Sequence, residues 1–207
     1  MKRHTSAWAL VMTAYAALAI PQANAHHPMG GGVPGNAIEG LLSGLGHPVI
    51  GFDHFLFVLA MGAACYYFGR KAGTIVTFIA ATVLGTVLHL YKTTLAYPDL
   101  WVALSLVVLG AMLFGAHRLL QSRAALGFFA LSGIAHGYAY GESIVGAEPT
   151  PLFAYLTGFT AIQLAIAFGG FLIARYVSVR KPSFPGLKAL GGALAAAGAG
   201  FVLLSLA

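Results

Sequence analysis

The sequence predicts an all-α integral membrane protein with six transmembrane helices that follow a cleavable signal peptide. Three observations support this fold class. The 207-residue chain is 59% hydrophobic and only 8% charged, whereas soluble domains carry about 25% charged residues. Its apolar runs are long and unbroken, which favours helices over a barrel of short alternating strands. Its basic residues gather in alternate connections between these runs, as in other multi-span membrane proteins.

Residues 1–25 have the pattern of a secretory signal peptide. A basic start at Lys2 and Arg3 precedes a short apolar core over 7–20, and Ala23-Asn24-Ala25 is a small-x-small cleavage site. The short core and the position of the cleavage pattern favour removal of this segment over its retention as a first helix.

Residues 26–47 would then form an outer leader that begins with His26 and His27. A free α-amine beside two imidazoles offers nitrogen donors that can chelate nickel or copper. The glycines that follow fit equally well with a solvated leader that binds nothing, and both interpretations stay open.

A short interfacial helix is predicted inside the leader, from Asn36 to Leu45. Asn36 can cap its start, and Glu39 lies three residues further on, which is the spacing of a capping box. Gly44 and Gly46 are expected to end the helix. Hydropathy then predicts a transmembrane domain over 48–207, with spans at approximately 48–68, 72–91, 98–117, 123–140, 152–177 and 187–206.

The basic residues predict the orientation of this domain. With the mature N-terminus outside, the outer connections contain only Lys92, as the positive-inside rule requires. This predicts a bacterial cytoplasmic (inner) membrane protein with a periplasmic N-terminus, and it makes the lipid bilayer, not nucleic acid, the partner of the basic charge. The inner connections hold Arg70, Lys71, Arg118, Arg123, Arg175, Arg180, Lys181 and Lys188.

Two further features of the sequence concern cysteine chemistry and helix packing. The single cysteine, Cys65, excludes an internal disulfide and a cysteine-based zinc finger. Pairs of small residues four apart, such as Gly191 with Ala195 in the last span, allow close helix packing and could also serve a homo-oligomer interface.

Two histidines and an aspartate lie at the mouth of the first predicted span. Imidazole and carboxylate bind borderline divalent metals, and ionisable groups at membrane depth usually mark a site or a pathway. His47 and His54 are seven residues apart, hence on one helical face but about 10 Å apart along the axis. One ion bound by both requires a broken helix, for which Pro48 and Gly51 supply the means. Asp53 points about 100° away from His54, towards another neighbour or a role behind the ligands. Alternatively, His47 caps a helix and His54 is a packed polar residue.

Other polar residues fall at the same outer end. His89 ends the second span, and His136, Tyr140 and Glu142 end the fourth. His136 and Tyr140 are four residues apart and therefore share a face. Because the orientation derived from Lys and Arg alone places these residues beside the first-span histidines, we predict one outer metal site. His89 could equally be an interfacial packing residue.

Three residues could extend a path inward from this site. Gln163 is polar in the middle of the fifth span, where it could line a path or form a hydrogen bond across helices. Met61 and Cys65 follow His54 on its helical face and could be soft ligands, although filling the core is the favoured interpretation for both.

The motifs His47-Pro48-x-x-Gly51-x-Asp53-His54 and His136-Gly137-x-Ala139-x-Gly141-Glu142 resemble those of the HupE/UreJ family of bacterial membrane proteins. The similarity covers essentially the whole mature chain. It implies a nickel permease, or sometimes a cobalt permease, that feeds hydrogenase or urease maturation proteins, with the ion as transported substrate and no organic cofactor.

By position, the resemblance implies transport roles for His47, Asp53, His54 and His136. The family often has a second histidine where this chain has Tyr140. Glu142 and His89 are the candidates to replace that nitrogen donor.

We therefore predict a permease, not an enzyme. The ion would be captured by His26, His27 and the acidic outer loops, bound at the histidines and passed inward; uptake should weaken below about pH 6, because imidazolium does not bind metal. Two other classes stay open. An intramembrane zinc metalloenzyme could use the same ligands, but the sequence has no H-E-x-x-H pair. A metal sensor or accessory protein would bind metal without transporting it, but no soluble signalling domain is evident.

Overall fold

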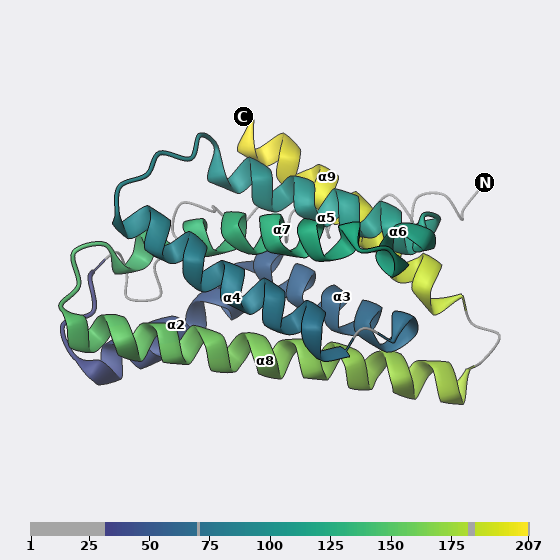
Figure 1. Ribbon diagram of the computed structural model, residues 1–207, viewed down its shortest axis with the longest axis horizontal. Coiled ribbons are helices and arrows are strands. Elements are labelled where there is room, and N and C mark those ends of the chain that lie inside the picture. The colour runs from purple at the N-terminus through teal and green to yellow at the C-terminus, as the bar shows by residue number, and fades with distance from the viewer. Residues whose placement is uncertain (1–31, 70, 182–184, 207) are drawn as a thin grey trace, which may run out of the picture.

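The computed structural model describes residues 32–69, 71–181 and 185–206, and every regular element in these ranges is helical. This confirms the predicted all-α class. The helices run back and forth along the long axis of the molecule (Figure 1). They are α2 (Ala37–Ile50), α3 (Phe52–Phe68), α4 (Lys71–Leu90), α5 (Pro98–Phe114), the short α6 (His117–Gln121), α7 (Ala124–Gly141), the 3-10 turn η2 (Glu142–Ile144), α8 (Pro149–Arg180) and α9 (Gly186–Ser205).

The described helices fit a membrane protein. On length and composition, α4, α8 and α9 can each cross a bilayer, and the bent pair α2–α3 can form a fourth span. Helix α5 is apolar but has only 17 residues. The count of six spans stays a prediction. The signal peptide at 1–25 lies outside the described residues.

The chain bends sharply at Gly51, where α2 and α3 meet at 77°. The Gly51 N–H donates to the His47 carbonyl at 2.9 Å and closes α2, while its carbonyl accepts from Phe55 N at 2.9 Å and opens α3. Pro48 lies in the last turn of α2, where it removes one backbone donor. The predicted break at Pro48 and Gly51 is therefore confirmed.

Helix α2 begins as predicted but ends later. Asn36 Oδ1 accepts from Glu39 N at 3.0 Å, and Asn36 Nδ2 donates to Glu39 Oε1 at 2.8 Å. The predicted end at Gly44 and Gly46 is wrong, because α2 continues to Ile50. A Cβ at Gly44 would collide with the Tyr155 carbonyl of α8. Gly44 therefore permits close packing of α2 on α8, which outweighs the low helix propensity of glycine.

Replacing Asn36 with alanine should destabilise the protein by about 1 kcal/mol, because the N–H of Glu39 loses its acceptor. Asn36 is exposed, so core packing should not change. Thermal unfolding in detergent measures the difference. Asn36→Ser keeps a capping oxygen and should be nearly neutral; an equal loss for both variants would contradict the capping role.

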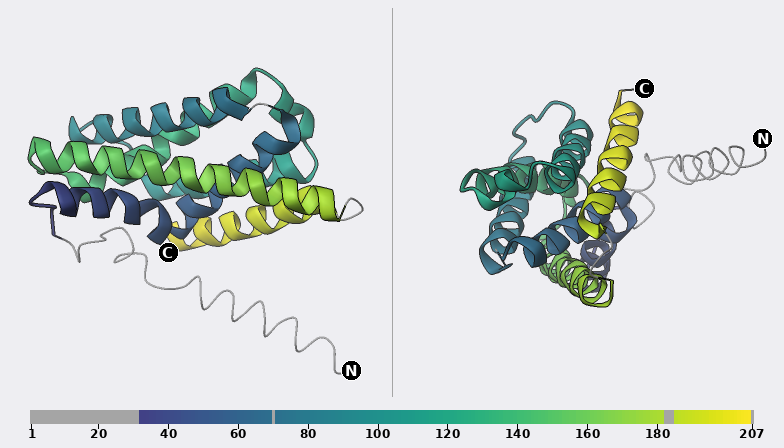
Figure 2. Two further views of the ribbon diagram at one scale, coloured as in Figure 1. Left: turned by 90° about the horizontal axis from the view of Figure 1, so that it is seen from below. Right: turned by 90° about the vertical axis from the view of Figure 1, so that its right-hand side faces the viewer.

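Close backbone contacts join the helices into three groups: α2 and α3 with α8, α4 with α7, and α5 with α9. Helices α2 and α3 follow one another along α8 (Figures 1 and 2). Glycines lie at these contacts. A Cβ at Gly62 of α3 would collide with a backbone carbonyl of α8, and one at Gly137 of α7 with a backbone carbonyl of α4. The backbones within each group therefore approach as closely as glycine allows.

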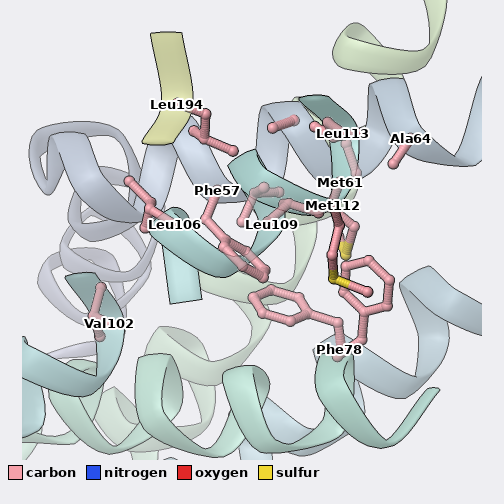
Figure 3. Packing of buried hydrophobic residues seen from close by; sticks show 14 of the residues in the cluster. Phe57, Met61, Ala64, Phe78, Val102, Leu106, Leu109, Met112, Leu113 and Leu194 are labelled. Carbon is pink, nitrogen blue, oxygen red and sulfur yellow. The ribbon is translucent and has the colours of Figure 1, made fainter. Parts of the chain in front are cut away.

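The interior of the molecule is largely apolar. We call the end with η2 and the α4–α5 connection the η2 end, and the opposite one the α6 end. An apolar core runs along much of the length of the molecule, from Val102 near the start of α5 to Leu120 of α6, and Figure 3 shows part of it. Met61 and Cys65 belong to this core and are buried. Labelled members of the core include Phe57, Phe78, Leu106, Leu109, Met112 and Leu113.

Candidate functional site

Three histidines from three helices meet at the bend between α2 and α3. His47 of α2, His54 of α3 and His136 of α7 are all fully buried. The Nδ1 atoms of His54 and His136 are 2.8 Å apart, and the ring centroids of His47 and His54 are 5.8 Å apart. We call these three residues the histidine cluster. His136 lies five residues before the end of α7, which places the cluster about 7 Å inside the η2 end.

The helix break is what brings His47 and His54 together. On a straight helix their seven-residue spacing would separate them by about 10 Å along the axis. The 77° bend at Gly51 turns the end of α2 and the start of α3 towards one another. Two imidazoles that a continuous helix would hold apart are thus neighbours within one short segment.

Tyr140 lies against the histidine cluster. It is fully buried, and its ring centroid is 4.5 Å from that of His54 and 5.0 Å from that of His47. Its hydroxyl has no hydrogen-bond partner among the described residues. Tyr140 therefore offers a phenol oxygen beside the histidines.

Asp53 lies behind His54. Its carboxylate is buried and accepts a hydrogen bond from His54 N at 2.8 Å, and Oδ1 is 4.0 Å from His54 Nε2. The residue occupies the first turn of α3, where the helix dipole stabilises a negative charge. From this position the carboxylate can balance the charge of a cation at the cluster.

Ser105 of α5 orients His136. Its hydroxyl donates to the Val102 carbonyl at 2.6 Å and lies 3.0 Å from His136 Nε2. Because the serine has one hydrogen, we assign His136 Nε2–H as the donor to Ser105. His136 Nδ1 then carries a lone pair and accepts from His54 Nδ1–H.

His47 has a similar support on the other side. Its Nδ1 lies 3.0 Å from Ser143 Oγ and 3.3 Å from the Tyr155 hydroxyl, which donates to the Tyr140 carbonyl at 2.8 Å. Such partners fix ring orientation and tautomer in metal-binding histidines. Sequence analysis missed Ser105, Ser143 and Tyr155, whose only signal is a hydroxyl within or beside an apolar segment.

The cluster is not arranged as a finished metal site. Among the residues that the structure describes, no three His, Cys, Asp or Glu side chains are placed to hold an ion. The nitrogens of His54 and His136 instead bond each other at 2.8 Å. Metal–nitrogen bonds of about 2.0–2.1 Å put two ligands of one ion roughly 3 Å apart or more. An ion must therefore replace this hydrogen bond, with a small movement of the rings.

Other predicted site residues lie elsewhere. His89 Nδ1 donates to the Tyr138 carbonyl at 2.8 Å, and the ring centroids of His89 and Tyr138 are 4.4 Å apart. Glu142 is exposed at the start of η2. His26 and His27 lie outside the described residues. The structure thus brings together His47, Asp53, His54, His136 and Tyr140, and not His89 or Glu142.

Aromatic side chains cover the α6 side of the cluster. The ring centroid of His136 is 4.6 Å from that of Phe57 and 5.6 Å from that of Phe78. Both phenylalanines belong to the apolar core (Figure 3). Gln163 lies outside this core. It is fully buried on α8 and faces Thr82 of α4.

The fold and the site define an all-helical protein with apolar helices of membrane-spanning length and a buried group of histidines. The chain belongs to the HupE/UreJ family, whose model, HupE / UreJ protein, matches residues 12–201. It is 29% identical over 198 residues to Protein HupE of Rhizobium leguminosarum bv. viciae, which covers 93% of this chain and 97% of that protein. No solved structure matches the chain. The family comprises accessory or transport proteins linked to nickel and cobalt handling for hydrogenase and urease.

Proposed function

We propose that the protein is a cytoplasmic-membrane permease for a divalent transition metal, nickel first and cobalt second, that supplies hydrogenase or urease maturation. The observation that carries the proposal is the convergence of His47, His54 and His136 at the break in the first span. Imidazole is a preferred ligand of these metals. Broken helices commonly form ion sites in transporters, because their ends leave polar groups inside the membrane.

The positions of the residues support the following roles. The three histidines bind the ion, and the Tyr140 hydroxyl is the nearest oxygen donor. Asp53 balances the charge of the ion from behind His54. Glu142 and His89 would serve capture at the outer, η2 end, and His26 and His27 would serve capture as part of the leader. Because the cluster is fully buried, the ion exchanges water for imidazole as it binds.

The membrane potential supplies the driving force for entry of the ion. The proposed topology has six spans, with the mature N-terminus outside and the α6 end in the cytoplasm, where maturation proteins would receive the ion. A potential that is negative inside contributes about 2.3 kcal/mol per charge per 100 mV, and hence about 4.6 kcal/mol for a divalent ion.

Metal flux into proteoliposomes with an imposed inside-negative potential tests this function. Nickel, cobalt, copper and zinc should be compared, with protein-free liposomes and liposomes without a potential as controls. We expect saturable, potential-dependent nickel uptake that falls below about pH 6 as imidazole protonates. Nickel bound in detergent without flux in any direction would replace the permease with a sensor or accessory protein. A protein that neither binds nickel nor transports it would contradict the proposed metal site.

A further inference from the structure

A shallow hollow lies on the surface of α8 near its C-terminal end. Its walls are side chains that recur every three or four residues and so gather on one side of the helix. They are Leu172, Arg175, Tyr176, Val179 and Arg180, and all five are exposed. The C-terminal turns of α8 continue past the end of α3 (Figure 1). This side of α8 is therefore not covered by another helix within the described part of the chain.

The hollow combines apolar walls with two cations. The Arg180 guanidinium carbon lies 5.3 Å from the centroid of the Tyr176 ring, a cation–π contact that restricts the orientation of the guanidinium. Because Tyr176 lies one turn before Arg180, this contact turns the guanidinium back towards Arg175, and both arginines border the same hollow. Two positive groups are thus held beside exposed apolar side chains.

The positive charge of this hollow is not balanced within the fold. Neither Arg175 nor Arg180 forms an ion pair within the described ranges. The acidic residues of the chain all lie towards the η2 end, in or beside the first turns of α2, α3, α5, η2 and α8. The hollow is therefore complementary to an anion from outside the chain. A second copy of the same surface would place arginine against arginine, which does not favour contact between copies.

The hollow lies where α8 would leave the bilayer. The helix has 32 residues and is about 48 Å long, whereas the hydrocarbon core of a bilayer is about 30 Å thick. The span predicted over 152–177 ends between Arg175 and Arg180. Tyrosine and arginine are typical of this depth, where their polar ends reach the headgroups. In the proposed orientation this is the cytoplasmic surface, which is rich in anionic lipids.

We propose that this hollow is a binding site for one anionic phospholipid of the inner leaflet. The guanidinium groups of Arg175 and Arg180 donate to the phosphate oxygens, a pairing that the planar fork of arginine favours. Leu172 lies about 4.5 Å deeper along the helix, where the acyl chains begin. The site rests on the membrane orientation proposed above, but not on transport of nickel.

Native mass spectrometry of the intact protein in detergent tests the site. Phosphatidylglycerol is titrated against phosphatidylcholine that has the same acyl chains. We expect the wild type to bind the first phosphatidylglycerol about tenfold or more tightly than phosphatidylcholine. The double variant Arg175→Gln with Arg180→Gln should lose this preference. The matched control, Arg118→Gln with Arg123→Gln, removes the same charge from exposed positions at the α6 end and should keep it.

Four results would overturn the site. The first is equal affinity of the wild type for the two lipids, and the second is an unchanged preference in the Arg175/Arg180 double variant. The third is an equal loss in the Arg118/Arg123 pair, which would show a diffuse effect of positive charge. The fourth is a change of oligomeric state in the Arg175/Arg180 variant without lipid, which would assign the surface to contact between copies of the chain.

Melting temperatures show whether each variant is folded. If the Arg175/Arg180 double variant does not fold, the single variants Arg175→Gln and Arg180→Gln decide by the same comparison, with an expected loss of about fivefold each in affinity for phosphatidylglycerol. These measurements use no nickel. A protein that binds the lipid here but transports no metal would thus contradict the permease function alone, and loss of the lipid site would leave that function standing.

Discussion

His54→Ala should reduce nickel uptake about a hundredfold or more. Loss of groups that only support a metal ligand already costs 10–100-fold, and His54 is the central member of the cluster. It bonds His136 at 2.8 Å and packs on Tyr140 and His47. Initial rates of uptake into proteoliposomes and nickel binding in detergent should fall together, because both need the same ligand.

His117→Ala is the matched control for this prediction. His117 lies in α6 at the opposite end, where its ring stacks on Phe68 at 6.1 Å and its Nδ1 lies 3.3 Å from the Met112 carbonyl. Its removal should leave uptake close to the wild-type rate. A folded His54→Ala protein that retained wild-type affinity and uptake would exclude the histidine cluster as the metal site. An equal loss in His117→Ala would show that the effect is not local.

Gly170→Ala should destabilise the protein by about 1–3 kcal/mol, the usual cost of an added methyl group in a tightly packed contact. A Cβ at Gly170 of α8 would collide with the carbonyl oxygen of Leu59 on α3 and lie 2.9 Å from its carbonyl carbon. The backbone cannot yield as a flexible side chain would, so α3 must move away from α8. A lower melting temperature in the same detergent would measure this effect.

The neighbouring glycine gives the control on the same helix. A Cβ at Gly169 meets no atom within 4 Å among the described residues. Gly169→Ala should be neutral or stabilising by up to about 1 kcal/mol, because alanine favours a helix more than glycine does. Similar melting temperatures for the two variants would contradict the close α3–α8 contact.

Hydropathy was a good guide to the long helices. The span expected at 72–91 is Lys71–Leu90, and the span expected at 187–206 is Gly186–Ser205. Such agreement is expected, since a segment in lipid must satisfy its own backbone and so forms a helix wherever it is apolar. The end of α2 could not be predicted in this way. Gly44 and Gly46 are typical of a helix end when read locally, but α2 continues through both, and Gly44 packs closely against α8.

The candidate site was predictable where it depends on spacing along one segment. Pro48 and Gly51 predicted the break, and the four-residue spacing predicted that His136 and Tyr140 share a face. The predicted membrane orientation placed His89 at the same end of the molecule as the histidine cluster. It could not predict the direction of the side chain, and His89 donates to the Tyr138 carbonyl instead. Ser105 could not be found in advance, because its role depends on how α5 packs against α7.

The glycine contacts have a mechanical consequence for the metal. His47 and His54 belong to the group formed by α2, α3 and α8, whereas His136 belongs to the group formed by α4 and α7. An ion bound by all three would act as a removable cross-link between these two bodies of packed helices. Separation of the bodies would then require release of the ion, and binding of the ion would hold them closed. By thermodynamic linkage, the stability gained by the closed arrangement grows with the logarithm of the metal concentration above the dissociation constant.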